Sequence, residues 1–160
     1  MERTGKKACD SILEQVCIVE ERHLNMFRHL FGGQAMTWMD LAAGGVARLY
    51  SGLEVTTVAV DDMIFTAPAE LGDRLIVRGR VTNVGRTSME VLVEVEIDAG
   101  GEADQRRLIQ KAHFVLVALD GNNQPAPVPP LIVETEEERE RWEAAEKRKV
   151  LRKERREMNI

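Results

Sequence analysis

A glycine pair followed by a single carboxylate is the part of this sequence best suited to chemistry. Gly32 and Gly33 begin an apolar segment, and Asp40 follows seven residues after Gly33, which places both on nearly the same face of a helix. Glycines at a helix start leave backbone N–H groups open at the positive end of the helix dipole, where an oxyanion is stabilised. A carboxylate buried in an apolar helix is suited to act as a base or a nucleophile. The pattern fits equally well a glycine turn followed by a hydrogen-bonded core aspartate.

Two other segments carry polar groups that could serve a site. Asn25 lies in the polar loop before the glycines, where its amide could orient a water molecule or a substrate carbonyl. Arg86, Thr87 and Ser88 join two predicted strands and suit a phosphate or a pantetheine-like chain. An ordinary hairpin turn explains the second segment equally well.

Several common kinds of site are excluded by the sequence. It contains no GxSxG, no P-loop and no GxGxxG. His23 and His29 lie in one loop without a third ligand, so no metal is expected. His113 falls in the middle of a strand, which favours a core or interface histidine with satisfied hydrogen bonds over a catalytic base. Cys9 and Cys17 form no CxxC pair and indicate two incidental thiols in an intracellular protein.

The composition limits the class of protein. A chain of 160 residues with 44% hydrophobic residues suits one globular domain with a proper core. The net charge of −5 argues against nucleic acid as a partner. The N-terminus lacks the apolar run of a signal peptide, and no apolar stretch approaches the ~20 residues of a bilayer span. We therefore expect a cytoplasmic protein without membrane insertion.

The hydrophobic pattern predicts an α+β fold that would position these groups. One helix is expected over residues 33–50, and five strands are expected over residues 11–20, 55–65, 74–84, 88–98 and 107–119, with a hairpin loop over residues 100–105. The helix is apolar on most sides and thin, so we expect it to be buried with something packed closely against it. Strand 88–98 alternates, with valines inward and Glu90 and Glu94 outward. Strand 107–119 is apolar on both faces and needs cover from a partner subunit or another element.

The end of the chain has a different composition. Four prolines over residues 125–130 predict an extended spacer. The segment that follows is acidic at its start and basic later, which favours a surface helix through its dipole. Two interpretations remain open: a basic tail that touches ligand phosphates, or a solvated helix that packs through Trp142.

These residues, in this order, resemble a known family. The blocks LFGGQAMTWMD, VGRTSMEV and VALDGNNQPAPVPP resemble the hotdog-fold acyl-CoA thioesterases of the acyl-CoA hydrolase type, bacterial members above all, over residues 10–140. The resemblance implies a five-stranded antiparallel sheet wrapped around one long central helix, with a C-terminal helix added. It divides the chain into an N-terminal extension (1–9), a hotdog domain (10–124), and the proline spacer with the charged helix (125–160).

The resemblance also assigns roles to residues. It implies a dimer as the minimal unit, commonly assembled into a hexamer as a trimer of dimers, with active sites at the dimer interface. The oxyanion glycine falls in Gly32-Gly33, with Gly33 favoured, the loop asparagine is Asn25, and Asp40 acts from the other subunit. Arg86, Thr87 and Ser88 match the segment that contacts the CoA portion. One position departs from the family pattern Asn-x-x-Gly: Arg28 stands where glycine is usual.

The function implied is hydrolysis of fatty acyl-CoA to free fatty acid and CoA, within fatty acid metabolism. No cofactor or metal is expected, because coenzyme A is part of the substrate and product. Two alternatives stay open: a non-catalytic acyl-CoA-binding protein on the same fold, and a hotdog hydratase or dehydratase, for which His29 could supply the base.

Overall fold

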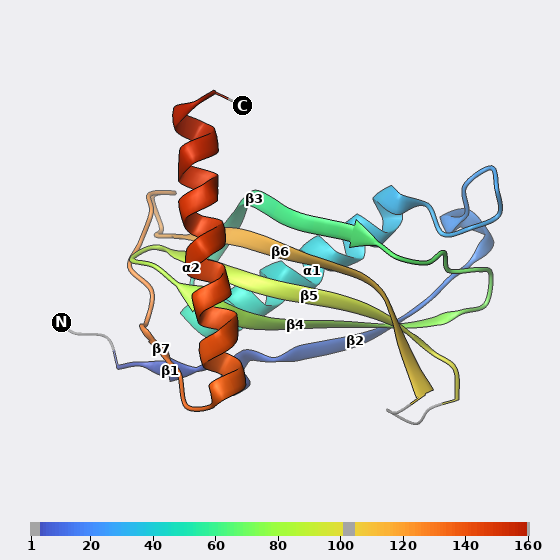
Figure 1. The fold of residues 1–160 in the computed structure, drawn as a ribbon, viewed down its shortest axis with the longest axis horizontal. Coiled ribbons are helices and arrows are strands. Elements are labelled where there is room, and N and C mark those ends of the chain that lie inside the picture. Colours follow the sequence, from blue (N-terminus) through green and yellow to red (C-terminus); the bar gives the residue numbers. More distant parts are fainter. Residues whose placement is uncertain (1–3, 101–104, 160) are drawn as a thin grey trace.

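The computed structural model, which describes residues 4–100 and 105–159, has a five-stranded sheet with one helix on each face (Figure 1). Its elements are β1 (Lys6–Lys7), β2 (Leu13–Ile18), α1 (Gly32–Ser51), β3 (Glu54–Phe65), β4 (Arg74–Val84), β5 (Ser88–Asp98), β6 (Arg106–Leu119), β7 (Leu131–Ile132) and α2 (Glu136–Glu157), with 3₁₀ turns at Ala8–Ser11 and Glu21–His23. In Figure 1, α1 lies behind the sheet and α2 crosses in front of it.

The sheet confirms the predicted hotdog architecture. Its strands are antiparallel and run in the order β2-β4-β5-β6-β3, so β2 and β3 form the two edges. The first strand is shorter than predicted, because the 3₁₀ turn Ala8–Ser11 occupies its expected start. The parallel pair β1–β7 was not predicted, since two residues per strand leave no periodicity to detect. The hairpin loop predicted over residues 100–105 lies largely outside the described residues.

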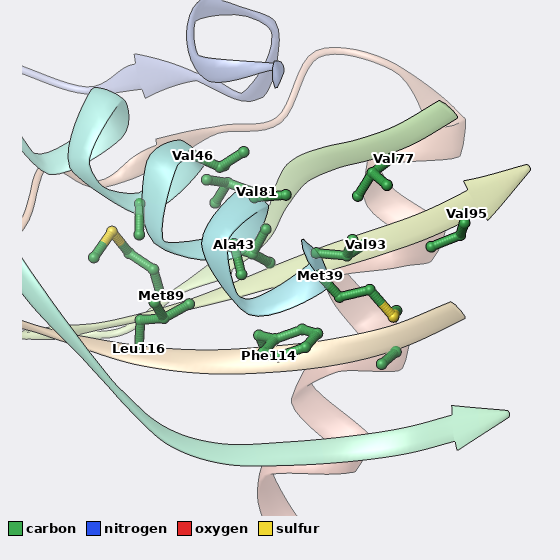
Figure 2. Close-up of a cluster of buried hydrophobic side chains, with 14 of the residues drawn as sticks. Met39, Ala43, Val46, Val77, Val81, Met89, Val93, Val95, Phe114 and Leu116 are labelled. Carbon is green, nitrogen blue, oxygen red and sulfur yellow. The ribbon is translucent and has the colours of Figure 1, made fainter. Parts of the chain in front are cut away.

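Close packing of α1 against the sheet builds the core. Met39, Ala43 and Val46 point from α1 onto the valines of β4 and β5 (Figure 2). The approach is tight: a Cβ built on Gly79 of β4 would lie 2.8 Å from Cγ2 of Val46. The small residues of the helix therefore serve the close contact that the sequence predicts.

The opposite face of α1 is exposed, which corrects the expectation that the helix is buried on most sides. Met36 is 44% exposed, Leu41 65% and Leu49 56%. Val58 on the edge strand β3 is 57% exposed. A helix with apolar residues all round is buried only where something covers each side, and no element of the described chain covers this one.

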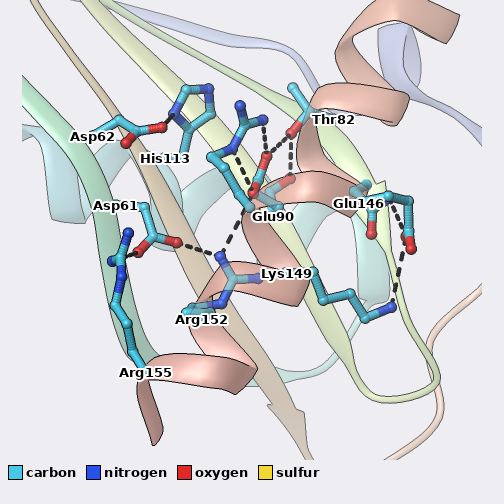
Figure 3. Close-up of polar contacts among 11 residues, drawn as sticks. Asp61, Asp62, Thr82, Glu90, His113, Glu146, Lys149, Arg152 and Arg155 are labelled. Carbon is cyan, nitrogen blue, oxygen red and sulfur yellow. Dashed lines mark hydrogen bonds and ion pairs between the residues drawn. The ribbon is translucent and has the colours of Figure 1, made fainter. Parts of the chain in front are cut away.

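The outer face of the sheet is covered by α2 (Figure 3). Ala145 of the helix is buried against it, while Trp142 is 37% exposed, so Ala145 is the fully buried contact and Trp142 packs only in part. Arg148 forms hydrogen bonds of 2.7 and 3.1 Å to the carboxylate of Glu90, which points outward as predicted but is buried under the helix. Arg152 pairs with Asp61 on β3. These two arginines therefore dock the helix. The interpretation of this segment as a basic tail that touches ligand phosphates stays a prediction for its exposed lysines.

His113 lies beneath α2, as a buried histidine of the outer face. Burial, together with the nearby Arg148, lowers its pKa. Its Nδ1 lies 3.8 Å from Oδ2 of Asp62 and has no hydrogen bond within the described chain. The prediction of a buried histidine is therefore confirmed, whereas the predicted hydrogen bond is missing at Nδ1.

The proline segment is extended but not a free spacer. The N–H of Ala126 donates to the carbonyl of Ala118, and the N–H of Val128 donates to that of Arg86. Both Ala126 and Val128 are buried, so the segment packs on the end of the sheet. No helix in the described part of the chain combines the length and the apolar character that crossing a bilayer requires.

Candidate active site

Asp40 lies on the exposed face of α1, where Thr57 of the neighbouring strand β3 orients its carboxylate. The Thr57 hydroxyl donates a 2.7 Å hydrogen bond to Oδ1 of Asp40. Asp40 is exposed in the single chain, which corrects both the expected buried carboxylate and the alternative of a core aspartate. A carboxylate that is held by one hydroxyl and open on its other side remains accessible to water and substrate.

An open groove runs along α1 and β3 past this carboxylate. It is lined by Asp40, Gly44 and Arg48 from the helix and by Thr57 and its neighbours from the strand. A Cβ built on Gly44 would meet no atom of the described residues within 4 Å, so the helix side of the groove is open. At the far end, Arg48 pairs with Glu54.

The N-terminus of α1 presents backbone donors, as the glycine pair predicts. Phe31 caps the helix without a side-chain hydrogen bond, and its carbonyl accepts from the N–H groups of Gln34 and Ala35. The N–H groups of Gly32 and Gly33 have no acceptor within the described chain. A Cβ built on Gly33 would lie 2.4 Å from the Phe31 ring, so the close approach of that ring requires glycine. This end of the helix can therefore stabilise a developing oxyanion.

Asn25 organises the loop that precedes these glycines. Its Oδ1 accepts hydrogen bonds from the N–H groups of Phe27 (2.9 Å) and His29 (3.2 Å). Its backbone N–H donates to the His29 carbonyl, which closes the loop into a tight turn. Asn25 thus fixes the backbone that leads into α1, a structural task that the sequence did not predict. The predicted role toward water or substrate stays a prediction.

Arg28 occupies a left-handed conformation within this loop, with φ of 61°. Glycine adopts such a conformation without a steric cost, whereas a residue with a Cβ does so under strain. Arg28 therefore replaces the family's usual glycine at the position of this loop where the backbone conformation favours glycine. The Arg28 guanidinium pairs with Glu21 at 2.9 Å, and both side chains are largely exposed.

The two halves of the proposed chemistry are separated within one chain. Seven residues of helix span about 10 Å between Gly33 and Asp40 along the axis. A thioester carbonyl bound at the Gly33 N–H would therefore lie beyond hydrogen-bond reach of the Asp40 carboxylate of the same chain. This geometry is consistent with a site that takes its donor and its carboxylate from two subunits.

The segment Arg86–Ser88 forms the turn between β4 and β5, which confirms the hairpin interpretation. The N–H of Gly85 donates to the carbonyl of Ser88 at 2.8 Å, and the Arg86 side chain is exposed. Ser88 lies two strands from Thr56, across β6, so about 10 Å separates it from the groove. The structure does not bring this segment to Asp40 within one chain, and its contact with CoA stays a prediction.

The described residues contain no group of three or more histidine, cysteine or acidic side chains that could hold a metal ion. Thr57 is the residue of this site that sequence reasoning missed. A threonine within a β-branched strand is common, and the hydrogen bond to Asp40 depends on the pairing of helix and strand, so the sequence carries no local signal for it.

Comparison with known proteins places this geometry in a family. The model of the thioesterase superfamily matches residues 27–103. An uncharacterised acyl-CoA thioester hydrolase of Zymomonas mobilis is 39% identical over 102 residues, which cover 64% of this chain and 68% of the relative. The chain spans only 24% to 30% of the length of the mammalian thioesterases that it matches.

Solved structures agree. Acyl-CoA hydrolase from Staphylococcus aureus, in complex with butyryl coenzyme A, coenzyme A and coenzyme A disulfide, superposes with a TM-score of 0.89 at 29% identity and covers 96% of this chain and 93% of its own. Alanine variants of that enzyme at an asparagine, an aspartate and a threonine have also been solved. An apo-hexameric acyl-CoA thioesterase has a TM-score of 0.88 at 34% identity, covering 95% and 97%. The chain therefore belongs to the acyl-CoA thioester hydrolases of the thioesterase superfamily and has their hotdog fold.

Proposed function

We propose that this protein hydrolyses fatty acyl-CoA thioesters to a free fatty acid and CoA. The observation that carries the proposal is the Asp40 carboxylate, held by Thr57 in an open groove on the exposed face of α1. Free N–H groups at Gly32 and Gly33 supply the complementary oxyanion site. The residue types replaced in the Staphylococcus aureus variants, asparagine, aspartate and threonine, match Asn25, Asp40 and Thr57.

Two routes through Asp40 are compatible with this arrangement. As a general base, the carboxylate takes a proton from water, the water oxygen attacks the thioester carbonyl, and the oxyanion is stabilised by the Gly33 N–H. The tetrahedral intermediate then expels the CoA thiolate, which recovers the proton from Asp40. As a nucleophile, the carboxylate attacks the carbonyl itself, the thiolate leaves, and water hydrolyses the resulting mixed anhydride.

The functional unit that we propose is a dimer. The exposed apolar residues of α1 and the open edge of β3 form one surface that a second chain would cover, with β3 pairing edge to edge. Asp40 lies on this surface, and the Gly33 donors of the partner would complete its site. The similarity to an apo-hexameric thioesterase supports a hexamer built as a trimer of dimers.

We further propose that the enzyme acts in the cytoplasm, in fatty acid metabolism, without a cofactor beyond the CoA of its substrate. Arg86, Thr87 and Ser88 are proposed to contact the CoA portion. Arg86 is exposed at the β4–β5 turn, where its guanidinium is free to reach a phosphate of a bound nucleotide.

Replacement of Asp40 by asparagine tests the proposal. Because Asp40 is exposed, Asp40→Asn should leave the thermal unfolding temperature and CoA binding unchanged while lowering free-thiol release from acyl-CoA about a thousandfold. Near-normal hydrolysis by this variant would overturn the proposal. Acyl-CoA binding by the wild-type protein without thiol release would identify a binding protein instead, and hydration of crotonyl-CoA would identify a hydratase.

Isotope labelling separates the two routes. A single turnover in water enriched in heavy oxygen places the label only in the fatty acid when Asp40 is a base. When Asp40 is a nucleophile and water attacks its side of the anhydride, the label enters the Asp40 carboxylate, which peptide mass spectrometry detects.

A further inference from the structure

A second pocket adjoins the N-terminal end of α1, and it shares no lining residue with the Asp40 groove. Its walls include Asn25 and His29 from the loop, Phe65 at the end of β3 with Thr66 after it, and Ile109 and Gln110 from β6. The Phe65 ring also contacts the helix start, because a Cβ built on Gly32 would lie 3.6 Å from its Cε1. The pocket therefore opens beside the place where the proposed function puts the thioester carbonyl.

Gln110 is a buried polar group in this wall whose carbonyl oxygen lacks a hydrogen-bond partner. The residue is only 4% exposed, and its Oε1 is buried without a hydrogen-bond partner in the described part of the chain. A buried carbonyl oxygen without a partner is unfavourable, and such a group calls for a specific explanation.

Two other polar side chains of the wall, Asn25 and Thr66, are already engaged. Asn25 Oδ1 accepts from two loop N–H groups, and the Thr66 hydroxyl donates to the Ile109 carbonyl at 3.0 Å. Gln110 therefore differs from Asn25 and Thr66 in having an acceptor to offer a ligand, and the imidazole of His29 is a further polar side chain of the wall.

A local irregularity of the sheet directs Gln110 toward this pocket. Across β5, Val95 pairs with Gln110 and Glu96 pairs with Leu108, so Ile109 is an extra residue in β6. The N–H of Thr66 donates to the Ile109 carbonyl at this point. Bulges re-aim side chains and are common beside active sites. As a result, both Ile109 and Gln110 are buried here.

From these contacts we infer that Gln110 determines substrate specificity by accepting a hydrogen bond from a hydroxyl group on the acyl chain. The inference rests on the proposed function and names its substrate class: short hydroxyacyl-CoA thioesters. Gln110 lines the pocket, and the last torsion of a glutamine side chain is broad, so the carboxamide can turn its Oε1 toward a bound ligand without moving β6. The apolar walls at Phe65 and Ile109 contact the carbon chain, and the Gln110 amide oxygen accepts the hydrogen bond from its hydroxyl group.

Matched substrates test this inference directly. We expect the wild-type protein to hydrolyse either 3-hydroxybutyryl-CoA or 4-hydroxybutyryl-CoA about tenfold more efficiently in kcat/KM than butyryl-CoA, because the unpaired amide discriminates against a chain without a donor. The difference should lie in KM, since the hydroxyl is bound equally in the ground and transition states.

The Gln110→Met variant keeps the length of the side chain and removes its hydrogen bonds. Its substrate ratio should fall to about one, and its unfolding temperature should rise, because no polar atom is then buried unpaired. Gln124→Met, at an exposed position in the loop after β6, is the matched control and should keep the wild-type ratio and the wild-type activity.

The outcomes separate the inference from the function on which it rests. Hydrolysis of butyryl-CoA with no preference for either hydroxylated chain overturns the role of Gln110 and leaves the thioesterase activity standing, as does a preference that survives in Gln110→Met. Failure to release thiol from any acyl-CoA overturns the proposed function itself. The wild-type ratio decides the question even if the variant does not fold.

Discussion

The hydroxyl of Thr57 donates a 2.7 Å hydrogen bond to Oδ1 of Asp40, so the first strand after the helix orients the carboxylate that the helix carries. The contact joins residues that are 17 positions apart and both belong to the open groove. It leaves the other carboxylate oxygen free to take a proton or to attack a carbonyl.

Removal of this hydroxyl should slow the chemical step. We expect Thr57→Val to lower kcat about tenfold with little change in KM, because the Asp40 carboxylate is no longer held in position by the hydrogen bond. A tenfold loss corresponds to an increase of about 1.4 kcal/mol in the activation free energy. Thr57→Ser keeps the hydroxyl and should retain most of the activity. The measurement is steady-state thiol release, and equal rates for the valine and serine variants would show that the hydrogen bond has no catalytic role.

A site shared between two chains predicts complementation. Asn25→Ala and Asp40→Asn should each be inactive, but a mixture refolded together should recover about one quarter of the wild-type activity, because half of the dimers are mixed and each has one intact site. Thiol release after co-refolding measures this recovery. Each variant refolded alone is the control, and no recovery in the mixture would place Asn25 and Asp40 of one chain in the same site.

The loop conformation at Arg28 predicts a gain in stability. Arg28→Gly should raise the unfolding temperature by about 2 °C, because glycine adopts the positive φ without strain. The gain is small because glycine also increases the conformational entropy of the unfolded chain. Arg28→Ala also removes the ion pair with Glu21 but keeps the strained backbone. Calorimetry should therefore rank glycine above alanine, and the reverse order would show that φ at this position costs nothing.

The docking of α2 depends on a buried ion pair. Arg148→Met should destabilise the protein by about 3 kcal/mol, because it leaves the Glu90 carboxylate buried with weaker compensation. Arg139→Met, which removes an exposed pair with Glu136, should change stability by less than about 0.5 kcal/mol. Urea unfolding compares the two, and the double change Arg148→Met with Glu90→Leu should restore much of the loss.

Alkaline pH should weaken the fold through Tyr50. Burial, with a smaller contribution from Asp10, raises the pKa of this tyrosine to about 12, and its hydroxyl donates to the Pro129 carbonyl at 3.1 Å. The unfolded chain releases this proton near pH ~10. The stabilisation is therefore complete below pH ~10 and is lost as the pH rises toward about 12.

Tyr50 is the single tyrosine of the chain, so near-ultraviolet tyrosinate absorbance reports on it alone. Its titration in the folded protein should have a midpoint well above that of the urea-unfolded protein. Tyr50→Phe should lose less stability than the wild type between neutral pH and pH ~11, and identical losses would contradict the assignment.

The sequence by itself determined the elements and the family. Alternation in 88–98 and the apolar run of 33–50 reflect local periodicities, and each reappears as β5 and α1 with nearly the predicted bounds. The glycine pair predicted open donors at the helix start because conformational freedom at that point is a local property. The carboxylate at Asp40 was identified for the same reason, as a residue type out of place in its surroundings.

Only the tertiary structure decided what those residues contact. Asp40 proved exposed because burial depends on which face of α1 meets the sheet, and the sequence pattern is apolar on both. Thr57 reaches Asp40 and Gln110 reaches its pocket through strand register and a bulge, which no local pattern encodes. The basic end of the chain became a docking helix because Glu90 and Asp61 lie beneath it, far away in sequence and adjacent in space.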